Sequence, residues 1–461
     1  MNQKQVNQPQ ENKMGVMPVN RLLLNMSLPM MASMLVQALY NIVDSIFVAK
    51  VSENALTAVS LAFPIQTLMI AVGTGTGVGV NALLARHLGE KDYDKVNKTA
   101  MNGLFLAVMS YLAFLIIGLV AVRPFYASQV GSADGEILMM GASYLTIICT
   151  CSFGLFTQLI SEKLLQATGM TIYSMITQAL GAVINIILDP ILIFGLCGMP
   201  KLGVTGAAVA TIIGQIIGGC FALYFNLSKN HEIHFFFHGF RPSGHAIGQI
   251  YRIGIPSIIM QAIGSVMTYG MNRILIVFSS TAAAVFGVYF KLQSFFFMPV
   301  FGLNNGMIPI VAYNYGAGRR KRLVKTIKLS LCYAFAVLFV GFLIFESIPQ
   351  QLLGLFEASD ELLAIGVPAL RIIGIHYLIA WFCIIAGSVF QALGNGIYSL
   401  LVSAARQLVV LLPVAYILAH TGGLHMVWWA FPIAEAVSCI VSSCFMVRIN
   451  RKVISKIPDR E

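Results

Sequence analysis

Apolar residues recur along this chain in long runs, and short polar segments separate one run from the next. About 20 consecutive apolar residues allow an α-helix to cross the hydrocarbon core of a membrane. The pattern therefore predicts an all-α integral membrane protein with twelve transmembrane helices and no soluble catalytic or ligand-binding domain. The predicted spans are residues 22–49, 55–84, 101–122, 136–160, 170–197, 203–225, 250–277, 282–311, 326–347, 362–390, 396–419 and 425–447.

The hydrophobic pattern also repeats, because the second half of the chain matches the first half. An even number of spans separates the copies, so the two six-helix lobes should have the same orientation, as in transporters built from parallel repeats. A duplicated membrane protein can also be a passive channel or a scaffold, but the repeat favours transport through a cavity between the lobes. A shift of 227 residues pairs Pro29 with Pro256, Gln66 with Gln293, Gly79 with Gly306, and Gly89 with Gly316, and near the fifth span the shift becomes 225.

The repeat sets the expected domain organisation. Residues 1–20 form a polar tail that is too polar for the apolar core of a signal peptide. Residues 21–225 form the N-lobe with six helices, and residues 249–447 form the C-lobe with six more. A polar loop at 226–248 joins the lobes, and residues 448–461 form a second tail. Because the expected cavity lies within one chain, we expect the protein to function as a monomer.

The distribution of charge predicts the orientation. The chain is 58% hydrophobic and 10% charged, whereas soluble domains are about 25% charged. Of its 29 Lys and Arg residues, 22 fall in segments on one side of the membrane, three fall within spans, and Lys50, Arg123, Lys201 and Arg371 fall on the other side. By the positive-inside rule both termini are cytoplasmic, in a bacterial-type plasma membrane. The net charge of +11 therefore reflects topology and contact with membrane lipids, and it does not predict nucleic-acid binding.

The sequence has no motif that indicates a cofactor-binding or metal-binding function. The eight cysteines lack the paired spacing of a zinc or redox site and are interpreted as packing residues. The stretch "GTGTGVG" at 73–79 imitates a phosphate loop, but it lies inside a predicted span with no strand before it. We expect no cofactor, and no metal apart from a possible sodium ion.

Two acidic residues stand inside predicted spans of the N-lobe. Ionisable groups are costly within a membrane and by default indicate a functional site. Asp44 lies six residues before Lys50 at the outer surface, and Asp189, in "INIILDPILIF", lies twelve residues before Lys201. Both carboxylates should therefore lie in the outer half of the N-lobe, where two carboxylates in one apolar site cannot both stay ionised cheaply.

Neutral oxygen donors accompany these carboxylates. Asn185 lies one helical turn from Asp189, and Thr211 on the sixth span lies within reach. Together with Asp44 they could bind a cation. Four oxygen-bearing side chains suit sodium, whereas a crowded carboxylate pair suits a proton, and we favour the proton slightly.

Polar stripes on the first and seventh spans are candidate linings of the transport path. The alternative interpretation is hydrogen bonding between helices. Prolines within the first, fifth and seventh spans remove a helical hydrogen bond and predict either hinges or static kinks. The lining candidates are Gln37, Tyr40, Asn41, Gln261, Ser265 and Asn272, and the hinge candidates are Pro29, Pro190 and Pro256.

The C-lobe carries a different set of charges. Glu435 is the acidic residue found deep in this lobe, and Arg273 and Lys291 are its expected partners. Arg406 is a third cation within a span. We interpret these residues as structural ion pairs rather than as a substrate site.

Several motifs together resemble the multidrug and toxic compound extrusion (MATE) family, in its DinF-like or MepA-like branches. The similarity covers roughly residues 20–450. It implies twelve helices in two lobes, an alternating-access cavity, and efflux of cationic amphipathic drugs driven by sodium or protons. The motifs include "SLPMMASMLVQALYNIVDSIFVAK", "INIILDPILIFG", "GVTGAAVAT" and "WWAFPIAE".

The resemblance also assigns roles to particular residues. It places the N-lobe cation site at Asp44, Asn185, Asp189 and Thr211, which are the residues already reached from depth and spacing. It associates Pro29 with bending of the first helix. The NorM-like branch carries further acids on the seventh and tenth helices, but this chain has no Asp or Glu in 250–277 or 362–390, so a C-lobe cation site is not expected.

Three functional hypotheses follow. The first is a cation-coupled antiporter that exports amphipathic organic cations. The second is a lipid-linked oligosaccharide flippase of related architecture, whose pyrophosphate would need cations such as Arg273, Lys291 and Arg406. The third, a membrane-embedded enzyme, has little support because the chain has no HExxH or GxSxG motif. We therefore expect a transporter, not an enzyme.

Overall fold

The computed structural model describes residues 11–130, 135–236, 239–356 and 359–459, which form helices and, within these ranges, no β-strand. The N-lobe helices are α2 (Val19–Ala49), α3 (Glu53–Gly89), α4 (Tyr93–Val120), α5 (Val122–Val130), α6 (Gly135–Thr150), α7 (Phe153–Ala167), α8 (Thr171–Phe194) and α9 (Val204–Ser228). The C-lobe helices are α10 (Gly244–Leu275), α11 (Ser280–Gly316), α12 (Arg320–Ser347), α13 (Pro349–Gly354), α14 (Asp360–Gly374), α15 (Tyr377–Ala392), α16 (Gly396–Ala404), α17 (Leu412–Val427) and α18 (Ala430–Lys452). Short elements are α1 (Lys13–Val16), η1 (Leu196–Gly198), η2 (Ala405–Leu411) and η3 (Ile454–Lys456).

The helices confirm the predicted all-α membrane fold. Within the described residues, ten helices are long and apolar enough to cross a membrane, and two bent pairs raise the number to twelve. The pair α6 and α7 bends by 46°, and the pair α14 and α15 bends by 53°. Neither bend contains a proline, since Cys151–Ser152 and Ile375–His376 occupy the two breaks.

The three candidate hinge prolines lie inside unbroken helices. Pro29 is within α2, Pro190 within α8 and Pro256 within α10. The breaks between α6 and α7 and between α14 and α15, by contrast, each carry a bend of more than 40°. Whether the prolines act as hinges stays a prediction.

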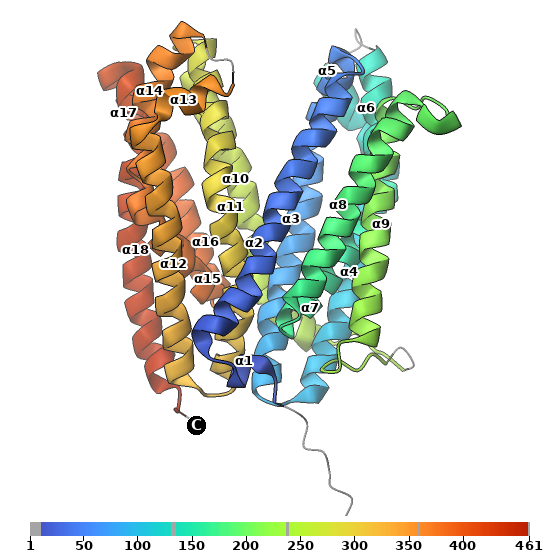
Figure 1. Ribbon diagram of the computed structural model, residues 1–461, viewed down its shortest axis with the longest axis vertical. Coiled ribbons are helices and arrows are strands. Elements are labelled where there is room, and N and C mark those ends of the chain that lie inside the picture. The colour runs from blue at the N-terminus through green and yellow to red at the C-terminus, as the bar shows by residue number, and fades with distance from the viewer. Residues whose placement is uncertain (1–10, 131–134, 237–238, 357–358, 460–461) are drawn as a thin grey trace, which may run out of the picture.

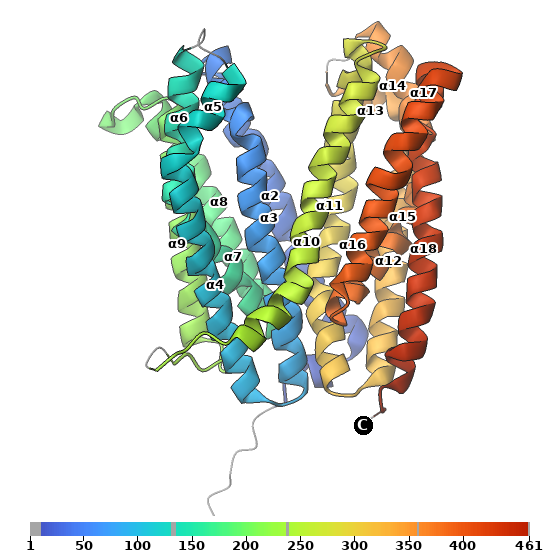
Figure 2. The ribbon, with the colours of Figure 1, turned by 180° about the vertical axis from the view of Figure 1, so that it is seen from behind.

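The two lobes form a V (Figures 1 and 2). Their ribbons converge at the end that holds α1 and the last described residues, and they diverge at the opposite end. The sequence predicts the converging end to be cytoplasmic, and we call it the inner end. Helices α2 and α3 of the N-lobe face α11 and α10 of the C-lobe along the convergence, which we call the seam.

Repeat-related glycines allow the helices to approach closely at the seam. A Cβ atom at Gly89 would stand 2.0 Å from the backbone oxygen of Tyr313, and one at Gly316 would stand 2.1 Å from that of Arg86. Glycine has no Cβ, so the two backbones can meet there. The shift of 227 that pairs Gly89 with Gly316 also pairs Arg86 with Tyr313. The internal repeat thus appears at the seam as two symmetric contacts.

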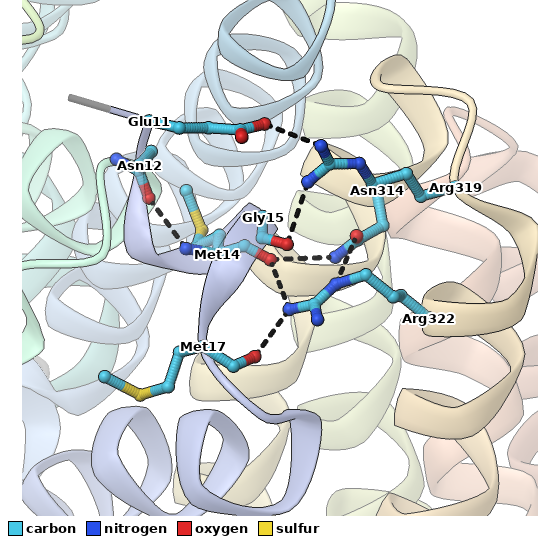
Figure 3. A network of polar contacts seen from close by, with 8 residues as sticks. All are labelled: Glu11, Asn12, Met14, Gly15, Met17, Asn314, Arg319 and Arg322. Carbon is cyan, nitrogen blue, oxygen red and sulfur yellow. Dashed lines mark hydrogen bonds and ion pairs between the residues drawn. The ribbon is translucent and has the colours of Figure 1, made fainter. Parts of the chain in front are cut away.

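The segment Glu11–Met17 connects the lobes across the inner end (Figure 3). The side-chain nitrogen of Asn12 donates to the backbone oxygen of Thr168 in the N-lobe at 3.1 Å. On the C-lobe side, Arg319 donates to Gly15 O at 2.8 Å, and Arg322 donates to Met17 O at 2.7 Å. We call this segment the clasp.

The outer half of the C-lobe is filled by aromatic side chains. The rings of Tyr289 and Phe431 lie 5.7 Å apart in an edge-to-face contact, and those of Phe345 and Tyr377 lie 5.2 Å apart. These four residues come from α11, α12, α15 and α18 and are buried. Their packing leaves this half of the lobe apolar and dense.

Candidate functional site

Close packing of α8 against α9 positions the predicted site. A Cβ atom at Gly214 on α9 would stand 2.6 Å from the backbone oxygen of Gly181 on α8, so a larger residue does not fit between the helices. Asn185 lies one turn from Gly181, and Thr211 lies one turn from Gly214. The close approach of the backbones therefore brings these two polar side chains into contact.

The amide of Asn185 connects Asp189 to Thr211. Its nitrogen donates to Asp189 Oδ2 at 3.0 Å, and its oxygen accepts from the Thr211 hydroxyl at 3.2 Å and from the Thr211 backbone N–H at 3.1 Å. All three residues are buried, with exposed fractions of 2% for Asn185, 0% for Asp189 and 7% for Thr211. The amide thereby fixes one oxygen of the Asp189 carboxylate.

Asp44 on α2 completes the predicted set. Its carboxyl lies within hydrogen-bonding reach of the Asp189 carboxyl, and the hydroxyl of Tyr40 lies within reach of Thr211. Oδ1 of Asp44 is buried and accepts no hydrogen bond from the described residues. The structure therefore brings together all four residues of the predicted cation site, with one carboxylate oxygen free for a further ligand.

An outer cavity opens onto Asp44. Its volume is about 360 Å³, and every lining residue belongs to the N-lobe. It lies among α2, α3, α6, α7 and α9 of one lobe, and the cavity expected between the lobes stays a prediction. Its polar and aromatic lining residues include Tyr40, Asn41, Asp44, Phe63, Gln66, Tyr144, Thr211 and Gln215.

A smaller pocket, which we call the inner pocket, continues from the outer cavity. Its volume is about 90 Å³, and it shares Tyr40, Leu155, Thr211 and Gln215 with the outer cavity. Glu162 on α7 lines it, together with the amide-bearing residues Gln37, Gln158, Gln178, Asn185 and Gln215.

Glu162 and its neighbour Lys163 are functional candidates that the sequence analysis missed. The predicted span ended at residue 160, and Lys163 was counted among the cytoplasmic charges. Helix α7 instead continues to Ala167, and both residues are buried, with exposed fractions of 4% and 8%. The spacing of Gln158, Glu162 and Gln166 at intervals of four could have indicated a polar helix face.

The other lining candidates lie at different places in the structure. Tyr40 and Asn41 line the outer cavity, and Gln37 lines the inner pocket, where it accepts a hydrogen bond from Gln178 at 3.3 Å. In the C-lobe, Gln261 donates to Thr74 Oγ1 of the N-lobe at 2.7 Å. Ser265 and Asn272 are exposed and line neither the cavity nor the pocket.

The C-lobe charges pair differently from the expectation. Arg406 Nη1 lies 3.4 Å from Glu435 Oε2, whereas the side chains of Arg273 and Lys291 are exposed. The nitrogen of Lys291 lies 5.9 Å from the centre of the Phe356 ring. The expected partnership of Arg273 and Lys291 with Glu435 is therefore wrong, because the buried Glu435 faces Arg406 on the π-helical turn η2. The three cations do not gather into one site.

The chemistry of the N-lobe set suits a small monovalent cation. Two carboxylates, one amide and two hydroxyls supply oxygen donors, which hard cations prefer over nitrogen and sulfur. Within the described residues, no three His, Cys, Asp or Glu side chains gather as a metal site. The same set accepts a proton, since two adjacent carboxyls share one more readily than they both ionise.

Comparisons with known proteins agree with this architecture. The MatE family model matches residues 29–191 and 256–417, which covers both repeats. Multidrug export protein MepA of Staphylococcus haemolyticus (strain JCSC1435) is 30% identical over 443 residues, covering 95% of each chain. MepA of Staphylococcus aureus (strain MRSA252) is 27% identical over 440 residues, covering 94% of each chain.

Solved structures match over the whole bundle. One is described as the outward-facing conformation of a multidrug resistance MATE family transporter of the MOP superfamily; it has a TM-score of 0.90 and 26% identity, covering 97% of this chain and 99% of that one. A MATE structure in the bent conformation has a TM-score of 0.88 and 27% identity, covering 95% and 96%. The fold and site thus define a two-lobed, multi-pass membrane transporter. The chain belongs to the MATE family and is similar to the MepA proteins.

Proposed function

We propose that this protein is a cation-coupled antiporter that exports amphipathic organic cations from the cytoplasm. The observation that carries the proposal is the pairing of Asp44 with the fully buried Asp189 beside one cavity inside the N-lobe. Two relatives, 30% and 27% identical to this chain, are named multidrug export proteins, and this supports drugs as the substrate class.

Coupling follows from competition for the carboxylates. A proton or sodium ion that enters from outside reduces the negative charge of the Asp44–Asp189 pair by one and so weakens its attraction for a cationic drug. Drug binding must then weaken ion binding by the same factor, because the coupling free energy is reciprocal. An inward ion gradient would therefore drive drug release to the outside.

The outer cavity has a size and lining that suit such substrates. Its volume of about 360 Å³ falls within the range of about 300–1,000 Å³ typical of small-molecule sites. Tyr40, Phe63 and Tyr144 offer aromatic faces near the carboxylates, and such faces attract lipophilic cations. Because all lining residues come from one chain, a monomer can carry out the transport.

Ethidium efflux from proteoliposomes tests the proposal. Wild-type protein and Asp189→Asn are reconstituted side by side, and efflux is driven by either an imposed pH gradient or an imposed sodium gradient. We expect one of the two gradients to drive wild-type efflux, which identifies the coupling ion, and we expect Asp189→Asn to lose it. The loss should lie in the range of about 5- to 150-fold typical of coupled sites.

Asp94→Asn is a suitable control because Asp94 is an exposed carboxylate in the first turn of α4. Its efflux should equal that of the wild type. Normal efflux by Asp189→Asn would overturn the site assignment. Wild-type protein that responds to neither gradient but scrambles lipids in the same vesicles would support the flippase hypothesis instead.

A further inference from the structure

Glu162 is an acidic residue buried in the N-lobe apart from the Asp44–Asp189 pair. It lies on α7, five residues before the helix ends at Ala167, and therefore nearer the inner end than Asp189. Its side chain is 4% exposed. A carboxylate buried this deeply within a membrane protein needs either a partner or a function.

The surroundings of Glu162 contain hydrogen-bond donors but no paired cation. Gln158 Nε2 and Thr177 Oγ1 donate to its Oε1 at 3.0 and 3.2 Å. The adjacent Lys163 points elsewhere, because residues one apart do not face each other on a helix. Its nitrogen donates to Gln166 Oε1 and to Asn305 Oδ1, both at 2.9 Å. Neutral donors alone compensate an ionised carboxylate poorly, so a bound proton stabilises this residue.

The inner pocket connects Glu162 to the carboxylate pair. It is lined by Glu162 at one end and by Asn185 and Thr211, the partners of Asp189, at the other. At about 90 Å³ it has room for a few water molecules but not for an amphipathic drug. Besides Lys163 on its own helix, the titratable lining residue near Glu162 is Tyr40 on α2, while α8 and α9 contribute amides and hydroxyls.

We propose that Glu162 is a second proton-binding carboxylate of the transport cycle, placed between the outer carboxylate pair and the cytoplasm. Asp44 and Asp189 share one proton taken up from outside, Glu162 takes up a second one through waters of the inner pocket, and both are released to the cytoplasm when the inner end opens. The inference rests on the proposed antiport, and it adds that the coupling ion is a proton and that the N-lobe binds protons at two depths.

Helix α7 provides a physical link between this proton and the motion of the lobes. Lys163 bonds to Asn305 on α11 across the seam, so separation of the inner ends must break that bond. The break frees α7 next to Glu162 and admits water from the cytoplasmic side. Proton release would thus occur only in the inward-open state, as antiport requires.

A structural role is the alternative, in which Glu162 only joins α7 to α8 by accepting from Thr177. The variant Glu162→Gln distinguishes the two roles, because a glutamine oxygen can accept the same hydrogen bonds but the side chain cannot carry a proton. Thr177→Val is the matched control: it removes one hydrogen bond and keeps the carboxylate. A structural role predicts a loss in Thr177→Val and little change in Glu162→Gln.

The experiment measures the steady-state ethidium gradient held by proteoliposomes against a pH difference of one unit, with the membrane potential clamped. Each coupled proton contributes about a tenfold factor per pH unit. We expect Glu162→Gln to hold a gradient about tenfold smaller than the wild type, and Thr177→Val and Glu162→Asp to hold nearly the wild-type gradient. In weakly buffered detergent solution, ethidium should release fewer protons from Glu162→Gln than from the wild type.

The outcomes separate this inference from the proposed function. A pH-driven gradient that is equal in wild type and Glu162→Gln overturns the role of Glu162 and leaves the antiport intact. A wild type driven by sodium alone overturns the proton assignment, and a wild type driven by neither ion overturns the antiport itself. If Glu162→Gln does not bind ethidium, Glu162→Asp and Thr177→Val decide: near-wild-type gradients in both support the proton-binding role, and a marked loss in both indicates a structural role.

Discussion

The outer halves of the two lobes are filled by different kinds of side chain, polar in the N-lobe and aromatic in the C-lobe, although the lobes are copies of one six-helix unit. In the N-lobe, the carboxylate of Asp44 and the amides of Asn41, Gln66 and Gln215 line a cavity of about 360 Å³. In the C-lobe, the rings of Tyr289, Phe345, Tyr377 and Phe431 pack against one another. The repeat shift places the buried Met271 at the position equivalent to Asp44, and Gly387 at the position equivalent to Glu162.

This difference indicates a division of labour after duplication. Under the proposed antiport, the N-lobe holds the groups that bind the ion, while the C-lobe supplies a densely packed body against which the N-lobe moves. The seam, by contrast, has kept its symmetry, since the contacts of Gly89 and Gly316 mirror each other. The residues of the outer halves therefore differ between the two repeats, whereas the glycine contacts at the seam are equivalent in both.

The largest expected difference between the lobes concerns their acidic residues. Asp44→Asn removes a charge from the N-lobe cavity and should reduce ethidium efflux from energised cells by at least about tenfold. Glu435→Gln removes the acid of the C-lobe ion pair and should leave efflux within about twofold, although it lowers thermal stability because Arg406 loses its partner. Efflux and melting temperature are measured on the same preparations. Equal loss of efflux in both variants would contradict the division of labour.

The symmetry of the seam can be tested with matched substitutions. Gly89→Ala and Gly316→Ala each force a Cβ atom to within about 2 Å of a backbone oxygen of the other lobe. Overpacking of this kind typically costs about 1–3 kcal/mol. Both variants should open the inner end to a similar extent, which spin-label distances across the seam can measure. A large effect in one variant and none in the other would show that the contacts are not equivalent.

A smaller effect is expected from the hydrogen bond that Lys163 makes across the seam. Lys163→Met keeps the length of the side chain but removes the donor to Asn305. One hydrogen bond to a charged group is worth about 1.5–3 kcal/mol, and loss of the desolvation cost of the charge offsets part of this. The inner end should open slightly, and cysteines placed there should react a few-fold faster with a membrane-impermeant reagent. Unchanged labelling would mean that this bond does not hold the seam.

Much of the architecture could be predicted from sequence because its signals are local. Spans follow from the length of apolar runs, and the lobes follow from the repeat. The set of Asp44, Asn185, Asp189 and Thr211 could also be predicted, since depth in a membrane can be counted along each helix from its charged ends. The structure adds the amide bridge from Asn185 to Asp189, which depends on the close approach of α8 and α9.

The features that were missed depend on tertiary contacts. Glu162 and Lys163 were assigned to a loop because charged residues normally end an apolar span, whereas in the fold they face an amide-lined pocket and the opposite lobe. The partner of Glu435 depends on the π-helical turn that carries Arg406, and no local pattern indicates this turn. The shape of the outer cavity likewise depends on how five helices pack, which periodicity alone does not determine.

The clasp has a practical consequence for anyone who labels this protein. Asn12 is bonded to the N-lobe, while Gly15 and Met17 are bonded to the C-lobe, so this segment must rearrange whenever the inner end opens. An affinity tag or fluorescent protein fused ahead of it is attached to a moving part and will shift the balance of conformations under study. At the other end of the chain, Asp459 pairs with Lys321 of the same lobe at 2.9 Å. A tag placed there follows a segment that is bonded to one lobe only, so it is the better choice for transport assays and for imaging.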